Sequence, residues 1–245
     1  MLRDLIEAVQ NGDVYTLIAI LITSAILIFL CLPSHEFAHS WAAHKLGDNT
    51  AKCQGRLTLN PFKHLDLLGT AMMLLIGVGY AKPVPVNMFN FKERKKDMAL
   101  VALAGPMMNL FCGIIFVFLD VLFSKYVLLQ TSALDYYNSS ALFYFHSIIK
   151  FVLSTTAQIS VSLAIFNLIP IPPFDGSRIL GFFLPDKIYY KIMQYEQIIF
   201  IVVLVMLWGG FLSGPLSTMM ENVLTGIYRL LSLPFGGISS FGGII

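Results

Sequence analysis

The feature that most constrains this chain is an uncharged run of 19 residues from Val14 to Leu32. As an α-helix this run would be roughly 28 Å long, about the thickness of the hydrocarbon core of a bilayer. The whole chain is 57% hydrophobic and 12% charged, against about 25% charged residues in a soluble domain. The sequence therefore predicts an integral membrane protein. Its net charge of +2 gives no support for a nucleic-acid partner.

Three further apolar stretches are long enough for helices that cross a bilayer, and polar segments separate them. The fold class we expect is membrane α-helical, a polytopic bundle of about 4–6 membrane segments that forms one domain over residues 1–245. In chain order we expect an interfacial helix at 1–13, a motif helix at 14–46, strands and a re-entrant segment at 51–96, spans at 97–124, 141–167 and 192–212, and an amphipathic tail at 213–245.

The stretch between the first two full spans has a different pattern. Polar and apolar residues alternate over 51–60, with Arg56 on the polar side, which predicts a half-buried strand. Residues 81–89 also look extended, but two prolines would confine them to the edge of a sheet. Residues 67–79 are apolar but too short to span, so we expect a re-entrant segment. Together they predict a small membrane-associated β element.

The first span leads directly into the sequence His-Glu-Phe-Ala-His at positions 35–39. Residues four apart lie on one face of a helix, so His35 and His39 can direct two imidazoles at one metal ion. Glu36 lies beside them, where a carboxylate can accept a proton from an attacking water. Three ionisable groups at the end of a membrane span are costly and typically functional. The pattern predicts a zinc peptidase motif, although a chance match of five residues is the alternative.

Catalytic zinc usually has a third protein ligand, and Asp175 is the strongest candidate. It belongs to Asn-Leu-Ile-Pro-Ile-Pro-Pro-Phe-Asp-Gly at 167–176, where three prolines must end a helix within an apolar region. Non-helical backbone at membrane depth is tolerated where protein buries it or a wet cavity borders it. An ordinary helix-ending turn is the other interpretation, since Pro, Asp and Gly all favour turns.

The HEFAH motif followed by NLIPIPPFDG resembles the site-2 protease family of intramembrane zinc metalloproteases. The segments GDNTAKCQGRLTLNPFKHLDLLG, GYAKPVPVN and AGPMMN are similar to the intervening parts of its compact bacterial branch. The resemblance implies one catalytic zinc ion held by His35, His39 and Asp175, with Glu36 as the general base. It also implies that Asn167 binds substrate or assists the oxyanion.

A role near the site for Asn109, including substrate binding, is also suggested by the resemblance, whereas helix–helix packing is the usual role of such a residue. The family resemblance implies transmembrane protein substrates and a bacterial cell membrane. The chain has no room for the PDZ or CBS domains found elsewhere in the family, so a regulatory membrane protein is a candidate partner. The sequence does not indicate the substrate or the oligomeric state.

The distribution of basic residues predicts the orientation. Twelve Lys and Arg residues lie in 45–96 and 178–191, and four lie in the remaining segments. The positive-inside rule therefore places those two stretches, and with them the active site, on the cytosolic side. We expect an intramembrane endopeptidase. The alternatives are a non-proteolytic membrane metal-binding protein or transporter, a membrane protease that trims exposed tails, and a catalytically silent relative.

Overall fold

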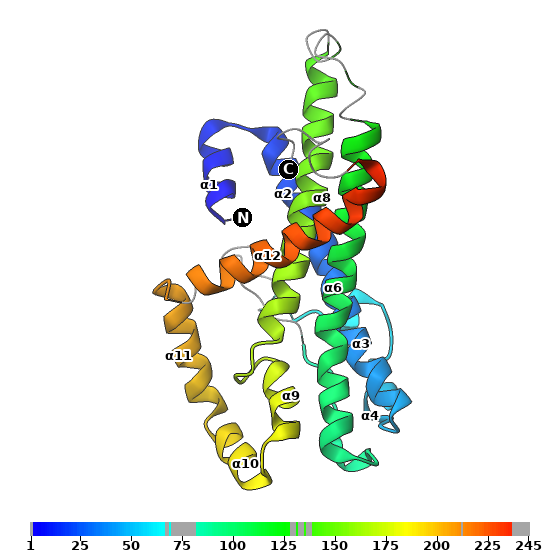
Figure 1. The fold of residues 1–245 in the computed structure, drawn as a ribbon, viewed down its shortest axis with the longest axis vertical. Helices are drawn as coiled ribbons and strands as arrows, with labels where there is room; N and C mark the ends of the chain where they lie inside the picture. The colour runs from blue at the N-terminus through cyan, green and yellow to red at the C-terminus, as the bar shows by residue number, and fades with distance from the viewer. Residues whose placement is uncertain are drawn as a thin grey trace.

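The structure is a computed structural model that describes residues 2–66, 69, 82–127, 131, 135, 139–211 and 213–236. All regular secondary structure in these residues is helical, and Figure 1 shows the helices gathered in an elongated bundle. Within this described part of the chain, three helical segments are long and apolar enough to cross a membrane: Val14–Lys45, Arg94–Tyr126 and Ser140–Asn167. They establish a membrane helical bundle and correspond to the expected segments at 14–46, 97–124 and 141–167.

The first membrane helix carries the motif and is continuous through Pro33. It consists of α2 (Val14–Ile26), the π-helical turn η1 (Leu27–Cys31) and α3 (Leu32–Lys45). Pro33 has no N–H to donate, and in the turn before it the Leu32 N–H reaches back five residues to the Leu27 carbonyl. The π turn therefore accommodates the proline without ending the helix. The short helix α1 (Leu2–Asn11) precedes this segment and packs on α2.

The two other long helices, α6 (Arg94–Tyr126) and α8 (Ser140–Asn167), pack against each other and against the first membrane helix. Their contact is close at Gly113, where an added Cβ would lie 2.6 Å from Val161 Cγ2. Small residues allow such an approach of two membrane helices. Cys31, Val117 and Ala157 are fully buried where the three segments meet.

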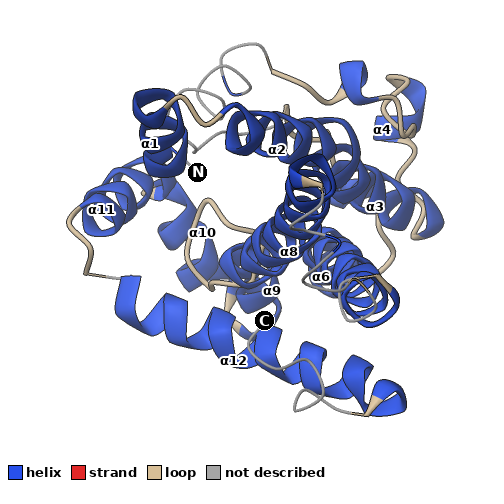
Figure 2. Cartoon of the chain, turned by 90° about the horizontal axis from the view of Figure 1, so that it is seen from above, coloured by secondary structure: helices blue, strands red, loops and turns tan. Residues whose placement is uncertain are grey.

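The described residues after α8 form four α-helices, α9 (Gly176–Phe183), α10 (Asp186–Gln194), α11 (Glu196–Trp208) and α12 (Ser213–Ser232), and the 3-10 turn η5 (Leu233–Phe235). The span predicted at 192–212 is not confirmed, because α10 ends at Gln194 and α11 has 13 residues. A helix of that length is about 20 Å long, shorter than the hydrocarbon core. Helix α12 lies across the outside of α6 and α8 (Figures 1 and 2).

The predicted β element is not found in the described residues. The strand expected at 51–60 is wrong: helix α4 (Thr50–Cys53) and turns occupy this stretch. Residues 82–87 form neither helix nor strand, although the Lys82 N–H donates to the His64 carbonyl at 2.8 Å, and η3 (Met88–Asn90) follows them. The alternation at 51–60 was misleading because Arg56 points inward. It is 7% exposed, and its guanidinium donates to the carbonyls of Lys63, Lys82 and Pro83. The re-entrant segment expected at 67–79 lies outside the described residues, apart from residue 69.

Candidate metal centre

Two histidines of α3 and one aspartate at the start of α9 come together inside the bundle. His35 Nε2 lies 3.0 Å from His39 Nε2. The Oδ2 atom of Asp175 lies 3.4 Å from His35 Nε2 and 3.3 Å from His39 Nε2. Both imidazoles are buried, and Asp175 is partly exposed. The fold thus brings residues 35 and 175 within contact distance, as the two motifs predicted.

The three candidate ligand atoms are spaced nearly as in a tetrahedral zinc site, with the two imidazole nitrogens slightly closer together. Tetrahedral zinc with bonds of about 2.0–2.2 Å places its ligand atoms roughly 3.3–3.5 Å from each other. The observed separations are 3.0–3.4 Å. Two imidazole nitrogens and one carboxylate also match the three protein ligands that catalytic zinc commonly has. His35, His39 and Asp175 therefore fit a zinc ion by both chemistry and spacing.

The second ring nitrogen of each histidine faces helix α6. His39 Nδ1 lies 2.7 Å from the Val101 carbonyl oxygen, which can only accept a hydrogen bond. His39 must then carry its proton on Nδ1, and its Nε2 lone pair remains for a metal. His35 Nδ1 lies 3.0 Å from the side-chain Nδ2 of Asn109. Both partners come from α6, two turns of helix apart.

Gly105 lies between these two partners on α6 and permits the close contact. A Cβ built at this position would lie 2.3 Å from His39 Nε2 and 2.6 Å from His35 Cε1. Any side chain would therefore displace both imidazoles. The helix can approach α3 this closely because position 105 carries no side chain.

Asp175 is held by the turn that follows α8. Its backbone caps the start of α9, which packs on α6. The next residue, Gly176, lies so close to the turn that a Cβ would be 2.3 Å from the Leu168 carbonyl oxygen. Burial opposes ionisation of Asp175, but its contacts with His35 and His39 lower the pKa of the carboxyl below its ordinary value. The turn therefore presents an ionised carboxylate to the two imidazoles.

Glu36 faces the extended segment at 82–87. Its Oε2 accepts a hydrogen bond of 3.1 Å from the backbone N–H of Val84, while its other carboxylate oxygen is not used in this bond. Arg56 holds the start of the segment, and Asp48 accepts from the N–H of Asn87 at its end. Burial of Asp48 is offset by hydrogen bonds from Thr50, Asn87 and Asn90, which lower its pKa. The segment is thus fixed at both ends beside the predicted general base.

Comparison with known proteins agrees with this geometry. The family model described as "Peptidase family M50" matches residues 23–210, which include all four motif residues discussed above. The chain belongs to this family, the site-2 protease family. It is 40% identical over 210 residues to "Putative zinc metalloprotease YwhC" of Bacillus subtilis (strain 168), covering 86% of this chain and 91% of that protein.

More distant relatives carry similar names. "Putative zinc metalloprotease Rip2" of Mycolicibacterium smegmatis is 29% identical over 198 residues, 79% of this chain and 68% of the relative. "Putative zinc metalloprotease MJ0611" of Methanocaldococcus jannaschii is 28% identical over 146 residues, 60% of this chain and 62% of the relative. No solved structure matches this chain. The family and these relatives identify a zinc-dependent protease that is embedded in the membrane.

The two asparagines predicted near the site of this M50 peptidase differ in their positions. Asn109 is 1% exposed and contacts His35 directly. Asn167 instead donates from its side chain to the Leu163 carbonyl of its own helix, at 3.0 Å. The structure therefore brings Asn109, but not the Asn167 amide, into contact with the ligand cluster.

Three contributions to the site were missed from sequence. Gly105 and the Val101 carbonyl act through backbone proximity, and Val84 acts through its N–H, so none has a side chain that signals a role. A signal for Gly105 and Asn109 was available, because both lie in AGPMMN with a spacing of four. The same spacing extended back to position 101 marks the face of the helix that meets the histidines.

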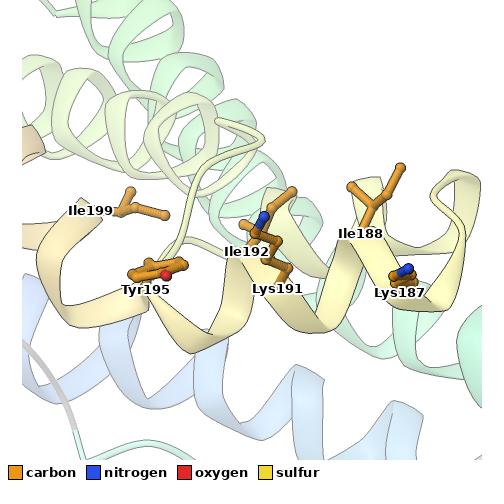
Figure 3. Close-up of a pocket in the computed structure, with 6 residues that line it drawn as sticks. All are labelled: Lys187, Ile188, Lys191, Ile192, Tyr195 and Ile199. Carbon is orange, nitrogen blue, oxygen red and sulfur yellow. The ribbon is translucent and has the colours of Figure 1, made fainter.

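An apolar pocket lies elsewhere, along α10 and the start of α11 (Figure 3). It shares no residue with the ligand cluster. Its lining combines two lysines with apolar and aromatic side chains: Lys187, Ile188, Lys191, Ile192, Tyr195 and Ile199. The lining has no His, Cys, Asp or Glu side chain that could bind zinc, so the metal chemistry belongs at the histidines.

A second buried polar cluster, here the Asp120 cluster, consists of Asp120, Ser124, Lys150 and Tyr228. The Lys150 ammonium lies 2.9 Å from Asp120 Oδ2 and donates to Ser124 Oγ at 3.1 Å. The Tyr228 hydroxyl of α12 donates to the same Asp120 oxygen at 2.5 Å. Burial, and then the charge of Asp120, raise the pKa of Tyr228, so the phenol keeps its proton. This cluster joins α6, α8 and α12.

Proposed function

We propose that this M50 peptidase cleaves membrane proteins within or beside their transmembrane segments, on the cytosolic side of a bacterial cell membrane. The observation that carries the proposal is the position of the ligand cluster. His35 and His39 belong to a membrane-crossing helix, and their partners on α6 belong to another. A substrate that reaches these residues has to come from the membrane or its boundary. Such substrates have helical segments that must unwind before a peptide bond is exposed.

The bound zinc ion would supply Lewis acidity, polarising the scissile carbonyl and lowering the pKa of water toward about 7. His35, His39 and Asp175 would hold it. Glu36 is placed to take the proton of the attacking water and to deliver it to the leaving amine. The Val84 N–H bonds one carboxylate oxygen, which leaves the other oxygen for this proton transfer.

The segment at 82–87 is a candidate for substrate binding. It is extended, it is anchored by Arg56 and Asp48, and it contacts Glu36. An unwound substrate could lie beside it as an added strand and satisfy its exposed backbone groups. Asn167, at the end of α8, would contribute an amide to the substrate carbonyl if its side chain turned away from Leu163.

A reconstituted cleavage assay tests this proposal. Purified protein in proteoliposomes would be mixed with a fully spanning reporter and with a reporter that exposes only a flexible cytosolic tail. Cleavage positions would be read by mass spectrometry. We expect cuts in or next to the spanning segment, and we expect Glu36→Gln to abolish them while retaining zinc. A chelator should also abolish cleavage by the wild type, but by removing its zinc.

The alternatives predict other results. Cleavage of the exposed tail alone would identify a tail-trimming protease and overturn the intramembrane assignment. Zinc binding without cleavage of either reporter would favour a metal-binding protein or transporter. A zinc-free protein after zinc is supplied would contradict the peptidase site itself. A requirement for a regulatory membrane protein would appear as activity restored by adding native membrane extract to the wild type but not to Glu36→Gln.

A further inference from the structure

We propose that Asn109 is a positioning residue for His35: its side-chain carbonyl accepts the Nδ1–H of His35 and thereby reserves Nε2 for the metal. This inference rests on the proposed zinc-peptidase site. It assigns to Asn109 a role in ordering a metal ligand in place of substrate binding.

An imidazole nitrogen that binds a metal must be unprotonated. A neutral imidazole has one N–H, so a metal-binding Nε2 requires the proton on Nδ1. The atom facing His35 Nδ1 must then be an acceptor. Asn109 is the residue there, with an amide atom 3.0 Å away. Its amide can present either NH2 or oxygen to His35 by a half-turn of the side chain, since the two ends have nearly the same shape.

The second step is the choice between these two orientations. With NH2 toward His35, the imidazole proton must lie on Nε2, where it would point at the other two ligand atoms. The Oδ1 atom of Asn109 then has no partner among the described residues, although the residue is 1% exposed. With the oxygen toward His35, the NH2 group of Asn109 no longer contacts His35 and is the end without a partner. Either orientation leaves one end of the amide without a hydrogen-bond partner, so hydrogen-bond satisfaction does not distinguish them. The need for an unprotonated Nε2 on His35 does, and it favours the orientation with the Asn109 oxygen toward His35.

The third step is the comparison with His39. Its Nδ1 faces the Val101 carbonyl, which is an acceptor in every state. Positions 101, 105 and 109 are four residues apart and lie along one face of α6. This face supplies a backbone acceptor for one ligand, a glycine that makes room, and a side-chain acceptor for the other. One imidazole is thus held by backbone, and the other depends on a side chain that can be changed.

Zinc affinity measured by competition with a chromogenic chelator tests the inference without any substrate. Asn109→Leu keeps the approximate shape but removes the acceptor, and it should weaken zinc binding about 10–100-fold, as loss of such partners does elsewhere. Asn109→Asp retains an acceptor and should restore most of the affinity. The matched control is Thr156→Val, which removes another fully buried side-chain oxygen without a partner, on α8. It should bind zinc like the wild type.

A second measurement needs no variant. Nitrogen NMR of histidine-labelled, zinc-loaded wild type should show the His35 proton on Nδ1, with the signal assigned by its loss in His35→Gln. Wild-type affinity in Asn109→Leu, or a His35 proton on Nε2, would overturn the positioning role while leaving the peptidase proposal intact. Absence of zinc binding by the wild type would instead overturn the site itself, and the inference with it. Should Asn109→Leu fail to fold, the NMR result decides alone.

Discussion

Two polar clusters are buried along helix α6, and they differ in the charges they contain. The Asp120 cluster includes its own cation, since Lys150 and Tyr228 donate to one carboxylate oxygen. Among the described residues no Lys or Arg contacts the metal centre, and its three candidate ligand atoms lie within 3.4 Å of each other. Polar groups at membrane depth need partners in both places.

The difference separates a structural cluster from a catalytic one. One oxygen of the Asp120 carboxylate, Oδ2, contacts an ammonium and a phenol, while Oδ1 is buried without a partner among the described residues, and these contacts join three helices. Two imidazoles and a carboxylate that converge on one point could hold a metal cation from outside the chain. We therefore expect changes in the metal centre to alter zinc content and proteolysis, and changes in the Asp120 cluster to alter stability with zinc content unchanged.

The largest effect should come from Gly105→Ala. The added Cβ would lie 2.3 Å from His39 Nε2, so the imidazoles would have to move out of their ligand positions. We expect loss of zinc and of all detectable cleavage, measured by metal analysis and reporter proteolysis. Gly226→Ala is the control, because a Cβ at that position of α12 meets nothing within 4 Å. Full zinc content in Gly105→Ala would mean that α6 does not constrain the ligands.

Among the substitutions that act on folding stability and not on zinc content, neutralising Asp120 should have the largest effect. Asp120→Leu leaves the partly exposed ammonium of Lys150 without its anion, and the cost should be below the roughly 3–5 kcal/mol typical of a fully buried pair. We expect a lower thermal midpoint in detergent and an unchanged zinc stoichiometry. The double variant Asp120→Leu/Lys150→Met removes both charges and should recover most of the loss. Zinc loss in the folded single variant would contradict the independence of the two clusters.

Val84→Pro tests the contact between the extended segment and the general base. The substitution removes the N–H that bonds Glu36 Oε2, and it retains an extended conformation between two other prolines. We expect a fall in kcat of roughly ten- to hundredfold, less than the total that a general base can supply. Zinc content should remain at the wild-type value. Val84→Ala keeps the N–H and serves as the control. Equal cleavage rates in the two variants would mean that the Val84 N–H does not support Glu36.

Tyr228→Phe should have the smallest effect. It removes one hydrogen bond to a charged group, an interaction worth roughly 1.5–3 kcal/mol, and leaves the Lys150–Asp120 ion pair in place. We expect a small decrease in thermal midpoint and faster tryptic cleavage at Arg229, because α12 is held less firmly. Activity and zinc should not change. A large loss of either would show that α12 couples the two clusters.

The candidate ligands could be recognised from sequence because their pattern depends on local rules. The spacing of His35 and His39 is a property of any helix, and the three prolines before Asp175 indicate non-helical backbone at membrane depth. These local rules do not predict the distance between the two segments. In the structure, Asp175 Oδ2 lies 3.3–3.4 Å from the Nε2 atoms of the two histidines. The long helices were equally predictable from apolar length.

Other features depend on tertiary contacts and were not predictable in this way. Arg56 lies inside because three carbonyls from distant segments surround it, so the polar alternation around it resembled a strand. Helix α11 shares its apolar run with the end of α10, and only the break at Tyr195 makes it short. Gly105 matters because of His39, a neighbour 66 positions earlier; its spacing of four from Asn109 marks a helix face but does not identify that neighbour.

The most direct test of the central claim is the zinc content of the purified protein, measured together with three variants. The account predicts about one zinc ion per chain in the wild type and in Lys150→Met, and none in His39→Ala or Asp175→Ala. This result would confirm that the metal centre needs an external cation and that the Asp120 cluster does not. Zinc retained in Asp175→Ala would place the third ligand elsewhere and contradict the pairing of the two motifs.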